Sequence, residues 1–443
     1  MSLFFESASA SYSLSSIYND IPFNVNASGS ASASSEISKE DAYKKALDLA
    51  KKNAQEKANS NLETILQTLK IQNEINIPET KINYYNSKSL LINVMNNGVP
   101  EIPLYGGISA WQGIRDLGSN SEQGTNVYLM VGTTNPSPTT GQGVICIGNI
   151  AGINNVLYYL NVPNSKSTSI YGPYYYEKTG LYSFVGSYNN GTSKQYAFYY
   201  SGHLNSLNVS SNFVYPSVNN DYEVTFLHSI ANQLIVGNSG NINPPSVISY
   251  IYDINDLTKI KTQILVPNFP EGVITTYGIW DNGNNTYTIV GGCTLTASTL
   301  LSIKSTYNLD LQTPIPYDYG FIMDYDNNTN TFSNFTPIKY KNSLTHFQGI
   351  SRAENGSYSL NADVVFDDGS VKGYFLKVYR DINNKFIFNE KLWIELNYLP
   401  SNLGITSSNS VVNNKVIGLF ISNDINTQPN VAYQSEILKL LRF

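Results

Sequence analysis

A short strand-like motif that ends in a small residue recurs along most of the chain, and this repetition limits the possible folds more than any other feature. Its copies are Val127–Gly132, Tyr182–Gly186, Gln233–Gly237, Tyr287–Gly291 and, more weakly, Tyr358–Ala362 and Lys415–Gly418. Successive copies lie roughly 50 to 70 residues apart, and each unit holds about four strand-like runs of period two. The period excludes helical solenoids, and four-stranded units of this size are typical of propeller blades.

The two ends of the repeat region complement each other. The last unit ends after Val431–Leu441 without a fourth strand, and a matching segment, Leu90–Pro100, precedes the first unit. A strand from the start that completes the last blade removes the open edge of a propeller ring. The sequence therefore predicts an all-β, six-bladed β-propeller over residues 88–443, closed by strand 90–100. Seven blades remain an alternative if the insertion at residues 294–316 hides a short one.

Residues 1–75 predict a separate small module, followed by a linker at 76–87. Apolar and small residues alternate with Ser and Asn over residues 7–15 and 23–34, which predicts a β-hairpin. Ser38 is suited to cap the helix that follows, with Glu40 and Asp41 in its first turn. Alanine then recurs at every fourth position: Ala42, Ala46, Ala50, Ala54 and Ala58. Such a stripe lies along one helix face, where a backbone can approach closely, so we expect the helix to lie on the hairpin.

The predicted hairpin has open edges, because a two-stranded sheet pairs each strand on one side only. We therefore expect an outer strand to pair with another copy or a neighbouring protein, and the alanine stripe to belong to this assembly face. The alternative is that the edges stay solvated behind their serines. Assembly of this kind predicts a homo-oligomer or attachment to a larger scaffold.

A polar or aromatic residue precedes a small one at one position in each repeat, where the innermost strand would face the propeller axis. These residues are Gln112, Tyr171, His228, Tyr277, Gln348 and Leu403. Such an axial ring could bind a small ligand or an ion. The alternative is a water-filled channel whose side chains satisfy each other.

Tyrosine, with 34 copies, is a second resource for binding. Tyr174, Tyr175 and Tyr176 run consecutively, and Trp280 lies in another repeat. Flat rings with a polar tip suit carbohydrate stacking and protein interfaces, so these four residues are candidates for ligand stacking. The alternative is that they fill the gaps between blades.

Several function classes lack their required parts. A net charge of −6 and a pI near 5.2 give no electrostatic footprint for nucleic acid. No catalytic motif or metal-ligand spacing is present, and Asp324–Asn330 fits a hairpin turn better than a calcium loop because a glycine and a distal glutamate are missing. Cys146 and Cys293 are expected to be buried free thiols, although a disulfide between them remains an alternative. No cofactor is expected.

The N-terminus has no signal-peptide pattern, and no window is apolar enough for a membrane span. We expect synthesis in the cytosol, with any surface role reached by release or by assembly into a particle.

The stretch Tyr277–Gly292, with its Gly-Ile-Trp and Tyr-Thr-Ile-Val-Gly-Gly segments, resembles a repeat of uncharacterised β-propeller-like proteins of giant viruses of protists and of some bacteria. The Ser/Ala strand followed by Ser38–Ala46 is similar to a small module of bacterial and viral surface proteins. The resemblance implies a virion or surface structural role and carries over no catalytic residue. We therefore expect a non-enzymatic structural or surface-display protein, or alternatively a carbohydrate-binding propeller.

Overall fold

The computed structural model describes residues 3–439 except 19–20, 76–84, 92–107, 121–124, 138–139, 151–154, 242–245, 297, 300–317, 354, 397–403 and 423–430. The chain divides into two compact units. The N-terminal unit comprises Met1–Pro78 together with Tyr379–Ile387, and the propeller unit comprises Glu79–Val378 and Phe388–Phe443.

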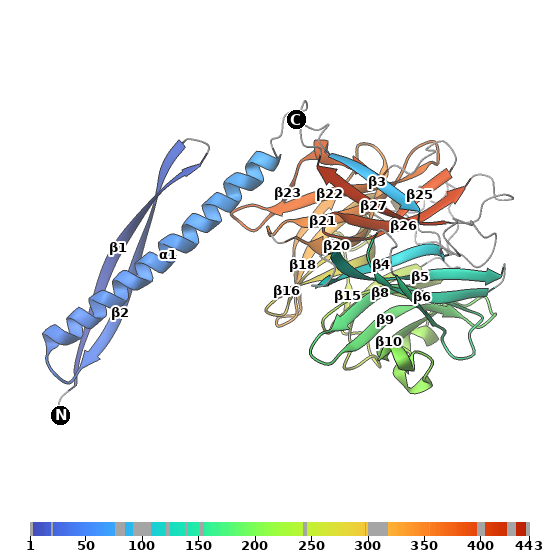
Figure 1. The fold of residues 1–443 in the computed structure, drawn as a ribbon, viewed down its shortest axis with the longest axis horizontal. Helices are drawn as coiled ribbons and strands as arrows, with labels where there is room; N and C mark the ends of the chain where they lie inside the picture. Colours follow the sequence, from blue (N-terminus) through green and yellow to red (C-terminus); the bar gives the residue numbers. More distant parts are fainter. Residues whose placement is uncertain are drawn as a thin grey trace. The chain divides into compact units, whose positions relative to one another are not determined.

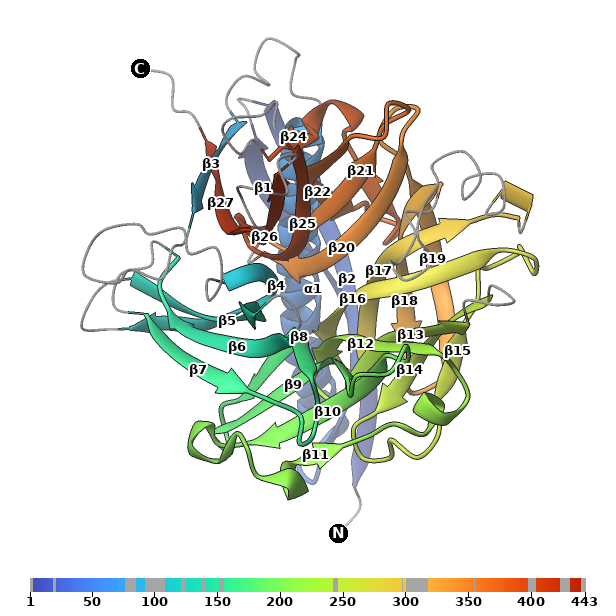
Figure 2. The same ribbon diagram turned by 90° about the vertical axis from the view of Figure 1, so that its right-hand side faces the viewer.

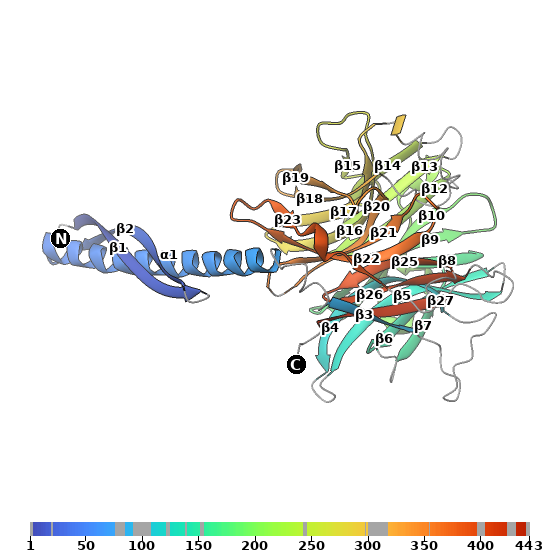
Figure 3. The same ribbon diagram turned by 90° about the horizontal axis from the view of Figure 1, so that it is seen from above.

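The N-terminal unit contains the predicted hairpin and helix (Figure 1). Strands β1 (Phe4–Tyr18) and β2 (Ile21–Ser35) pair antiparallel in continuous register, and α1 (Lys39–Ile75) follows. Ser38 caps the helix, because its Oγ accepts the Asp41 N–H at 3.1 Å. The hairpin twists along the helix (Figure 3). The serine and asparagine side chains that alternate over residues 7–15 and 24–34 are exposed.

The alanine stripe is covered by the chain's own hairpin. Ala42, Ala46, Ala50, Ala54 and Ala58 are all fully buried. The contact is so close that a Cβ added to Gly29 would lie 2.5 Å from the Ala50 carbonyl oxygen and from the Ala54 nitrogen. The predicted packing of helix on hairpin is therefore present. The prediction that these alanines form an assembly face is wrong, because they have no surface left for another chain.

The propeller unit is built from small antiparallel sheets around a common centre (Figure 2). Three of them are consecutive in sequence: β12–β15 (Val224–Ala231, Leu234–Asn241, Ser246–Asp253, Thr262–Ile264), β16–β19 (Val273–Gly283, Thr286–Thr294, Tyr319–Asp326, Thr331–Ile338) and β20–β24 (Leu344–Arg352, Tyr358–Val365, Val371–Arg380, Phe386–Phe388, Ile394–Glu395). A fourth sheet joins β25 (Gly404–Val412), β26 (Lys415–Ser422) and β27 (Val431–Lys439) to β3 (Tyr85–Leu91).

The remaining strands form one eight-stranded sheet. Its members are β4 (Ile108–Asn120), β5 (Thr125–Ser137), β6 (Thr140–Gly148), β7 (Val156–Leu160), β8 (Ser167–Tyr176), β9 (Leu181–Asn189), β10 (Tyr196–Gly202) and β11 (Phe213–Val214). Short 3-10 turns cover Leu204–Ser206, Ser210–Asn212, Ser217–Asn220 and Glu390–Leu392. The predicted all-β propeller arrangement is present. However, the hydrogen bonds among the described strands define four separate blades and not six. The strands from β4 to β11 are instead joined in the one eight-stranded sheet.

The last sheet is completed by a strand from before the first repeat. Tyr85 pairs with Lys439 and Leu91 with Tyr433 in an antiparallel register. The strand starts within the segment predicted as a linker, so it lies earlier than the predicted 90–100. Residues 92–100 are outside the described residues, as is most of the insertion that raised the seven-blade alternative.

The hydrophobic core lies between neighbouring sheets. In one cluster, Leu234 and Val236 of β13 pack with Ile279 of β16 and Ile289 of β17, all of them buried. The two cysteines, Cys146 and Cys293, are buried and form no disulfide, as predicted. Burial raises the pKa of both thiols to about 12.

The segment that superficially resembles a calcium loop forms the turn between β18 and β19. The Asn328 N–H donates to Asp326 Oδ1 at 2.8 Å, and the Tyr325 hydroxyl donates to Asn330 Oδ1 at 2.7 Å. These hydrogen bonds use the carboxylate and amide oxygens within the turn itself.

Candidate functional site

Each of six inner strands carries a β-bulge at the equivalent place. The register shifts fall between Trp111 and Gly113 in β4, Ile170 and Gly172 in β8, Leu227 and Ser229 in β12, Thr276 and Gly278 in β16, Phe347 and Gly349 in β20, and Ser408 and Ser410 in β25. A bulge leaves one residue out of the ladder and re-aims its side chain. The residues left out are Gln112, Tyr171, His228, Tyr277, Gln348 and Asn409, and all six line one pocket of about 440 Å³.

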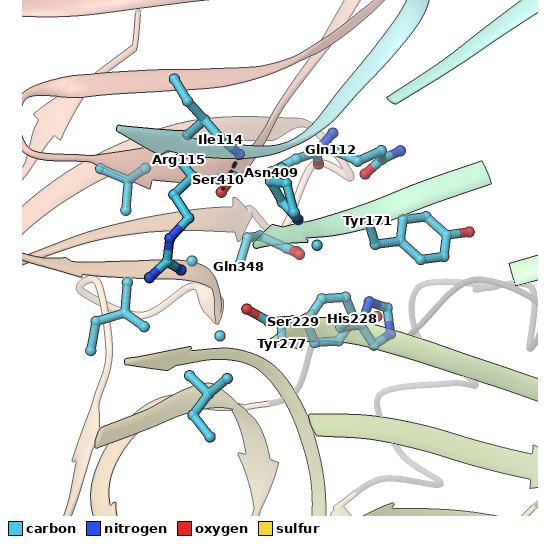
Figure 4. Close-up of a pocket in the computed structure, with 18 of the residues that line it drawn as sticks. Gln112, Ile114, Arg115, Tyr171, His228, Ser229, Tyr277, Gln348, Asn409 and Ser410 are labelled. Carbon is cyan, nitrogen blue, oxygen red and sulfur yellow. Dashed lines mark hydrogen bonds between the residues drawn. The ribbon is translucent and has the colours of Figure 1, made fainter. Parts of the chain in front are cut away.

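The small residue after each bulge allows the inner strands to pack closely. A Cβ added to Gly113 would lie 2.2 Å from the Tyr171 carbonyl oxygen, and one added to Gly172 would lie 2.8 Å from that of His228. The ring also closes between β25 and β4. Asn409 Nδ2 donates to the Trp111 carbonyl oxygen at 2.7 Å. The Ile114 N–H donates to Ser410 Oγ at 3.3 Å, as the dashed line in Figure 4 shows.

Five of the six residues predicted for the axial ring therefore meet in this pocket. The sixth, Leu403, lies outside the described residues, and Asn409 takes the equivalent place in β25. The sequence carried a signal for it: Asn409-Ser410-Val411 repeats the order polar, small, aliphatic that Gln112-Gly113-Ile114 shows. The glycine at position 404 made the earlier segment look like the better match.

One side of the pocket is aromatic. The rings of Tyr171 and His228 lie 5.3 Å apart between centroids, those of His228 and Tyr277 3.9 Å, and those of Tyr277 and His346 4.4 Å (Figure 4 shows the first three residues). His346 Nε2 hydrogen-bonds to Thr275 Oγ1 at 2.9 Å. Burial lowers the pKa of both histidines to about 3, so each imidazole is neutral near pH 7. His228 is 8% exposed, and its Nε2 has no partner among the described residues.

The other side of the pocket is formed by amides around a buried carboxyl group. Gln348 Nε2 donates to Asp363 Oδ2 at 3.2 Å, the Ser407 hydroxyl donates to the same oxygen at 2.6 Å, and the Ser408 N–H donates to Oδ1 at 2.7 Å. Burial raises the pKa of Asp363 to about 6, although these hydrogen bonds favour its charged form. Asp363 thereby ties β21 to β25 and orients Gln348.

An apolar layer follows two residues beyond each bulge. Its members, all lining the pocket, are Ile114, Pro173, Ile230, Ile279, Ile350 and Val411. Arg115 and Trp280 come next along their strands. The Arg115 guanidinium carbon lies 3.9 Å from the Tyr174 ring centroid and 6.0 Å from that of Trp280.

The predicted stacking residues do not all share one set of neighbours in the structure. Trp280 lines the pocket, and Tyr174 lies under Arg115. The rings of Tyr174 and Tyr176 lie 4.7 Å apart between centroids, and the Tyr176 hydroxyl donates to the Asn232 carbonyl oxygen at 2.6 Å. Tyr175 instead packs on Tyr182, with 4.7 Å between centroids. Alternation along β8 sends consecutive tyrosines to different neighbours, so the run does not form a single platform.

The arrangement offers hydrogen bonding and stacking around a small cavity. Within the part of the chain that the structure describes, no cluster of His, Cys, Asp or Glu could hold a metal ion. Of the pocket carboxylates, Asp363 is held as above, and Asp116 Oδ1 accepts the Gly118 N–H at 2.8 Å. No helix among the described residues is both long and apolar enough to span a membrane.

Comparison with known proteins gives distant structural similarity alone. No family model matches the chain, and no curated protein matches it. A protein of unknown function from Dyadobacter fermentans is 8% identical, with a TM-score of 0.48 over 81% of this chain and 100% of that one. Trypanosoma rangeli sialidase is 6% identical, with a TM-score of 0.44 over 79% of this chain and 59% of that one. The catalytic domain of a Coprinopsis cinerea GH62 α-L-arabinofuranosidase is 10% identical, with a TM-score of 0.34 over 80% and 96%.

Proposed function

We propose that the propeller is a non-enzymatic binding module whose axial pocket holds a small carbohydrate. The observation that carries this proposal is the ring of six bulged residues, whose side chains line one cavity of about 440 Å³. Pockets of a few hundred Å³ are of the size that encloses small ligands. A ring built by six separate bulges is specialised in a way that a solvent channel does not require.

The chemistry of the ring favours a ligand rich in hydroxyl groups. Gln112, Gln348 and Asn409 offer amide groups, which both donate and accept hydrogen bonds. The neutral imidazole of His228 adds an unpartnered ring nitrogen, and Tyr277 and Trp280 add aromatic surface. Glycoside hydrolysis ordinarily uses two opposed carboxyl groups, and the hydrogen bonds that hold Asp363 support a structural task for it.

A glycan array probed with the full chain tests this function. We expect a restricted set of glycans to bind, and Gln112→Leu to weaken that binding roughly tenfold because it removes an amide from the ring while keeping a similar shape. Gln263→Leu, at an exposed position of β15, is the matched control and should bind as the unmodified chain does. Array binding that Gln112→Leu leaves unchanged would place the ligand elsewhere and contradict the proposal.

We also infer that the propeller has six blades, with two of them in the eight-stranded sheet. Its halves, β4–β7 and β8–β11, are each a four-stranded meander, and a single parallel pair, Gly141 with Ser167, joins them. Each half supplies one of the six bulges to the axial ring. This supports a count in which every bulged inner strand begins one blade.

A second role, assembly through the N-terminal unit, is favoured by its open hairpin. Among the described residues β1 and β2 pair only with each other, over 15 residues each. Such long edges are suited to accept a strand from another chain. We propose that the unit joins the propeller to a larger assembly, such as a homo-oligomer or the surface of a virus particle, which then displays the propeller.

Light scattering coupled to size-exclusion chromatography tests this second role. Ser11→Lys places a charge in the middle of β1, where it should hinder strand addition and shift the chain toward the monomer. Ser211→Lys, at an exposed position of the propeller, is the control. A chain that is monomeric at all concentrations without substitution would overturn the self-assembly form of this role.

A further inference from the structure

One cation lies in the lining of the axial pocket. Arg115 is on β4, three residues beyond the bulge at Gln112, and it is partly buried. Its guanidinium carbon lies 3.9 Å from the Tyr174 ring centroid. In Figure 4 the guanidinium group lies on the side of the pocket away from Tyr171 and His228.

Arg115 has no hydrogen bond or ion pair with any described residue. Asp281 is near enough to favour the charged form of Arg115. However, Asp281 Oδ1 accepts the Gly283 N–H at 2.8 Å within its own turn. Asp116, the next residue along β4, is likewise engaged with Gly118. Stacking on Tyr174 uses the flat face of the guanidinium and leaves its N–H groups available.

Three other partly buried cations of the propeller form ion pairs. Lys339 pairs with Asp318, Lys372 with Glu395 at 2.9 Å, and Lys415 with Glu436. A buried cation without a partner is costly, because it loses hydration and gains no compensating charge. Burial indeed lowers the pKa of Arg115 below its ordinary value. The missing partner therefore requires an explanation.

We propose that Arg115 binds the carboxylate of the ligand, so that the axial pocket selects an acidic sugar over a neutral one. This inference rests on the proposed function and specifies its ligand class. The planar guanidinium donates two parallel hydrogen bonds to a carboxylate, and the aliphatic layer around it excludes water that would weaken the pair. The amides and His228 in the bulge ring would then bind the hydroxyl groups of the same molecule.

A structural role for Arg115 makes different predictions. If the guanidinium served only to stack on Tyr174 and join β4 to β8, its removal would lower stability and leave ligand preference unchanged. If it serves a ligand, replacement by a neutral side chain relieves an unpaired charge. The melting temperature of the ligand-free chain would then stay the same or rise.

Isothermal titration calorimetry on the full chain separates these roles with two matched pairs of probes, D-glucuronate with D-glucose and D-galacturonate with D-galactose. Within each pair the sugars differ in having a carboxylate or a hydroxymethyl group. We expect at least one uronate to bind roughly tenfold or more tightly than its neutral partner. Arg115→Gln should remove that preference, and Arg115→Lys should keep part of it. Arg352→Gln, at an exposed arginine near Tyr358, is the control and should keep the preference.

Each outcome decides between the alternatives. Equal affinity for acid and neutral sugar, no binding of either uronate, or a preference that survives Arg115→Gln would overturn the assignment. A melting temperature lowered by Arg115→Gln, with ligand preference intact, would show the structural role. The proposed function is separable, because neutral glycans that bind in a Gln112-dependent way would preserve it while this inference fails. Absence of binding in both the array and the calorimeter would overturn both.

Discussion

At the scale of single residues, the pocket contains ionisable groups whose burial makes stability depend on pH. His228 lines the pocket and His346 lies behind Tyr277, and burial lowers the pKa of each to about 3. Their rings contact Tyr277 from two sides, with 3.9 Å and 4.4 Å between centroids. A protonated imidazole in this position would be a buried cation, so the folded state requires both to be neutral.

We predict that His228→Phe makes the chain more resistant to acid. The folded form binds fewer protons than the unfolded form between about pH 3 and 6.5, so stability is lost as the pH falls through that window. Between pH 7 and 4.5 the loss from one such histidine is about 2–3 kcal/mol. Urea unfolding at the two pH values measures the difference. A pH dependence equal to that of the unsubstituted chain would show that His228 is protonated in the fold.

Asp363 acts in the opposite direction. Its folded pKa is raised to about 6, above its value in the unfolded chain, so the folded form holds an extra proton between about pH 4 and 6. Stability from this group is therefore lost as the pH rises through that window. We predict that Asp363→Asn removes a change of about 2 kcal/mol between pH 4 and 7, while the exposed Asp221→Asn leaves it in place. Urea unfolding across this range tests the prediction, which an unaltered pH profile in Asp363→Asn would contradict.

At the scale of strands and helices, the packing of the N-terminal unit depends on close contact between the backbone of β2 and the backbone of α1. The hairpin approaches α1 so closely at Gly29 that a methyl group would meet the backbone at Ala50 and Ala54. We predict that Gly29→Ala destabilises this unit by about 1–3 kcal/mol, because strand and helix must separate. Hydrogen exchange of the α1 amides measures the loss, and Ser28→Ala on the exposed face is the control. Equal protection in both variants would mean that the contact is looser than described.

The sequence predicted elements better than it predicted the site, and particular residues show why. The alternation of small or apolar residues with Ser and Asn predicted β1 and β2, and the small residue after each bulge indicated the axial positions. Both patterns lie within a single strand, so they can be recognised without knowing which strands pair. Asn409 was missed since glycine at 404 imitates the pattern, and only strand register distinguishes the two. The surroundings of Arg115 could not be predicted, because the rings of Tyr174 and Trp280 reach it from two other strands.

At the scale of the whole molecule, the propeller takes its closing strand from the segment that follows the helix. The final sheet has the order β25-β26-β27-β3, so the first and last parts of the propeller unit share one hydrogen-bonded ladder. A ring closed this way resists opening, because both ends must leave the sheet before the inner strands can separate. Among the described residues, those before Tyr85 supply no strand to this ladder.

Two truncations that differ only around β3 therefore test the closure. A chain that lacks residues 1–78 keeps β3, and we expect its propeller to melt as in the full chain and to stay monodisperse. A chain that lacks residues 1–91 loses β3 and exposes one edge of β27 over the seven pairs from Tyr433 to Lys439. An unpaired edge is a template for aggregation, so this chain should melt several degrees lower and associate with concentration. Differential scanning calorimetry and light scattering compare the two, and identical behaviour would mean that the ring holds without its last strand.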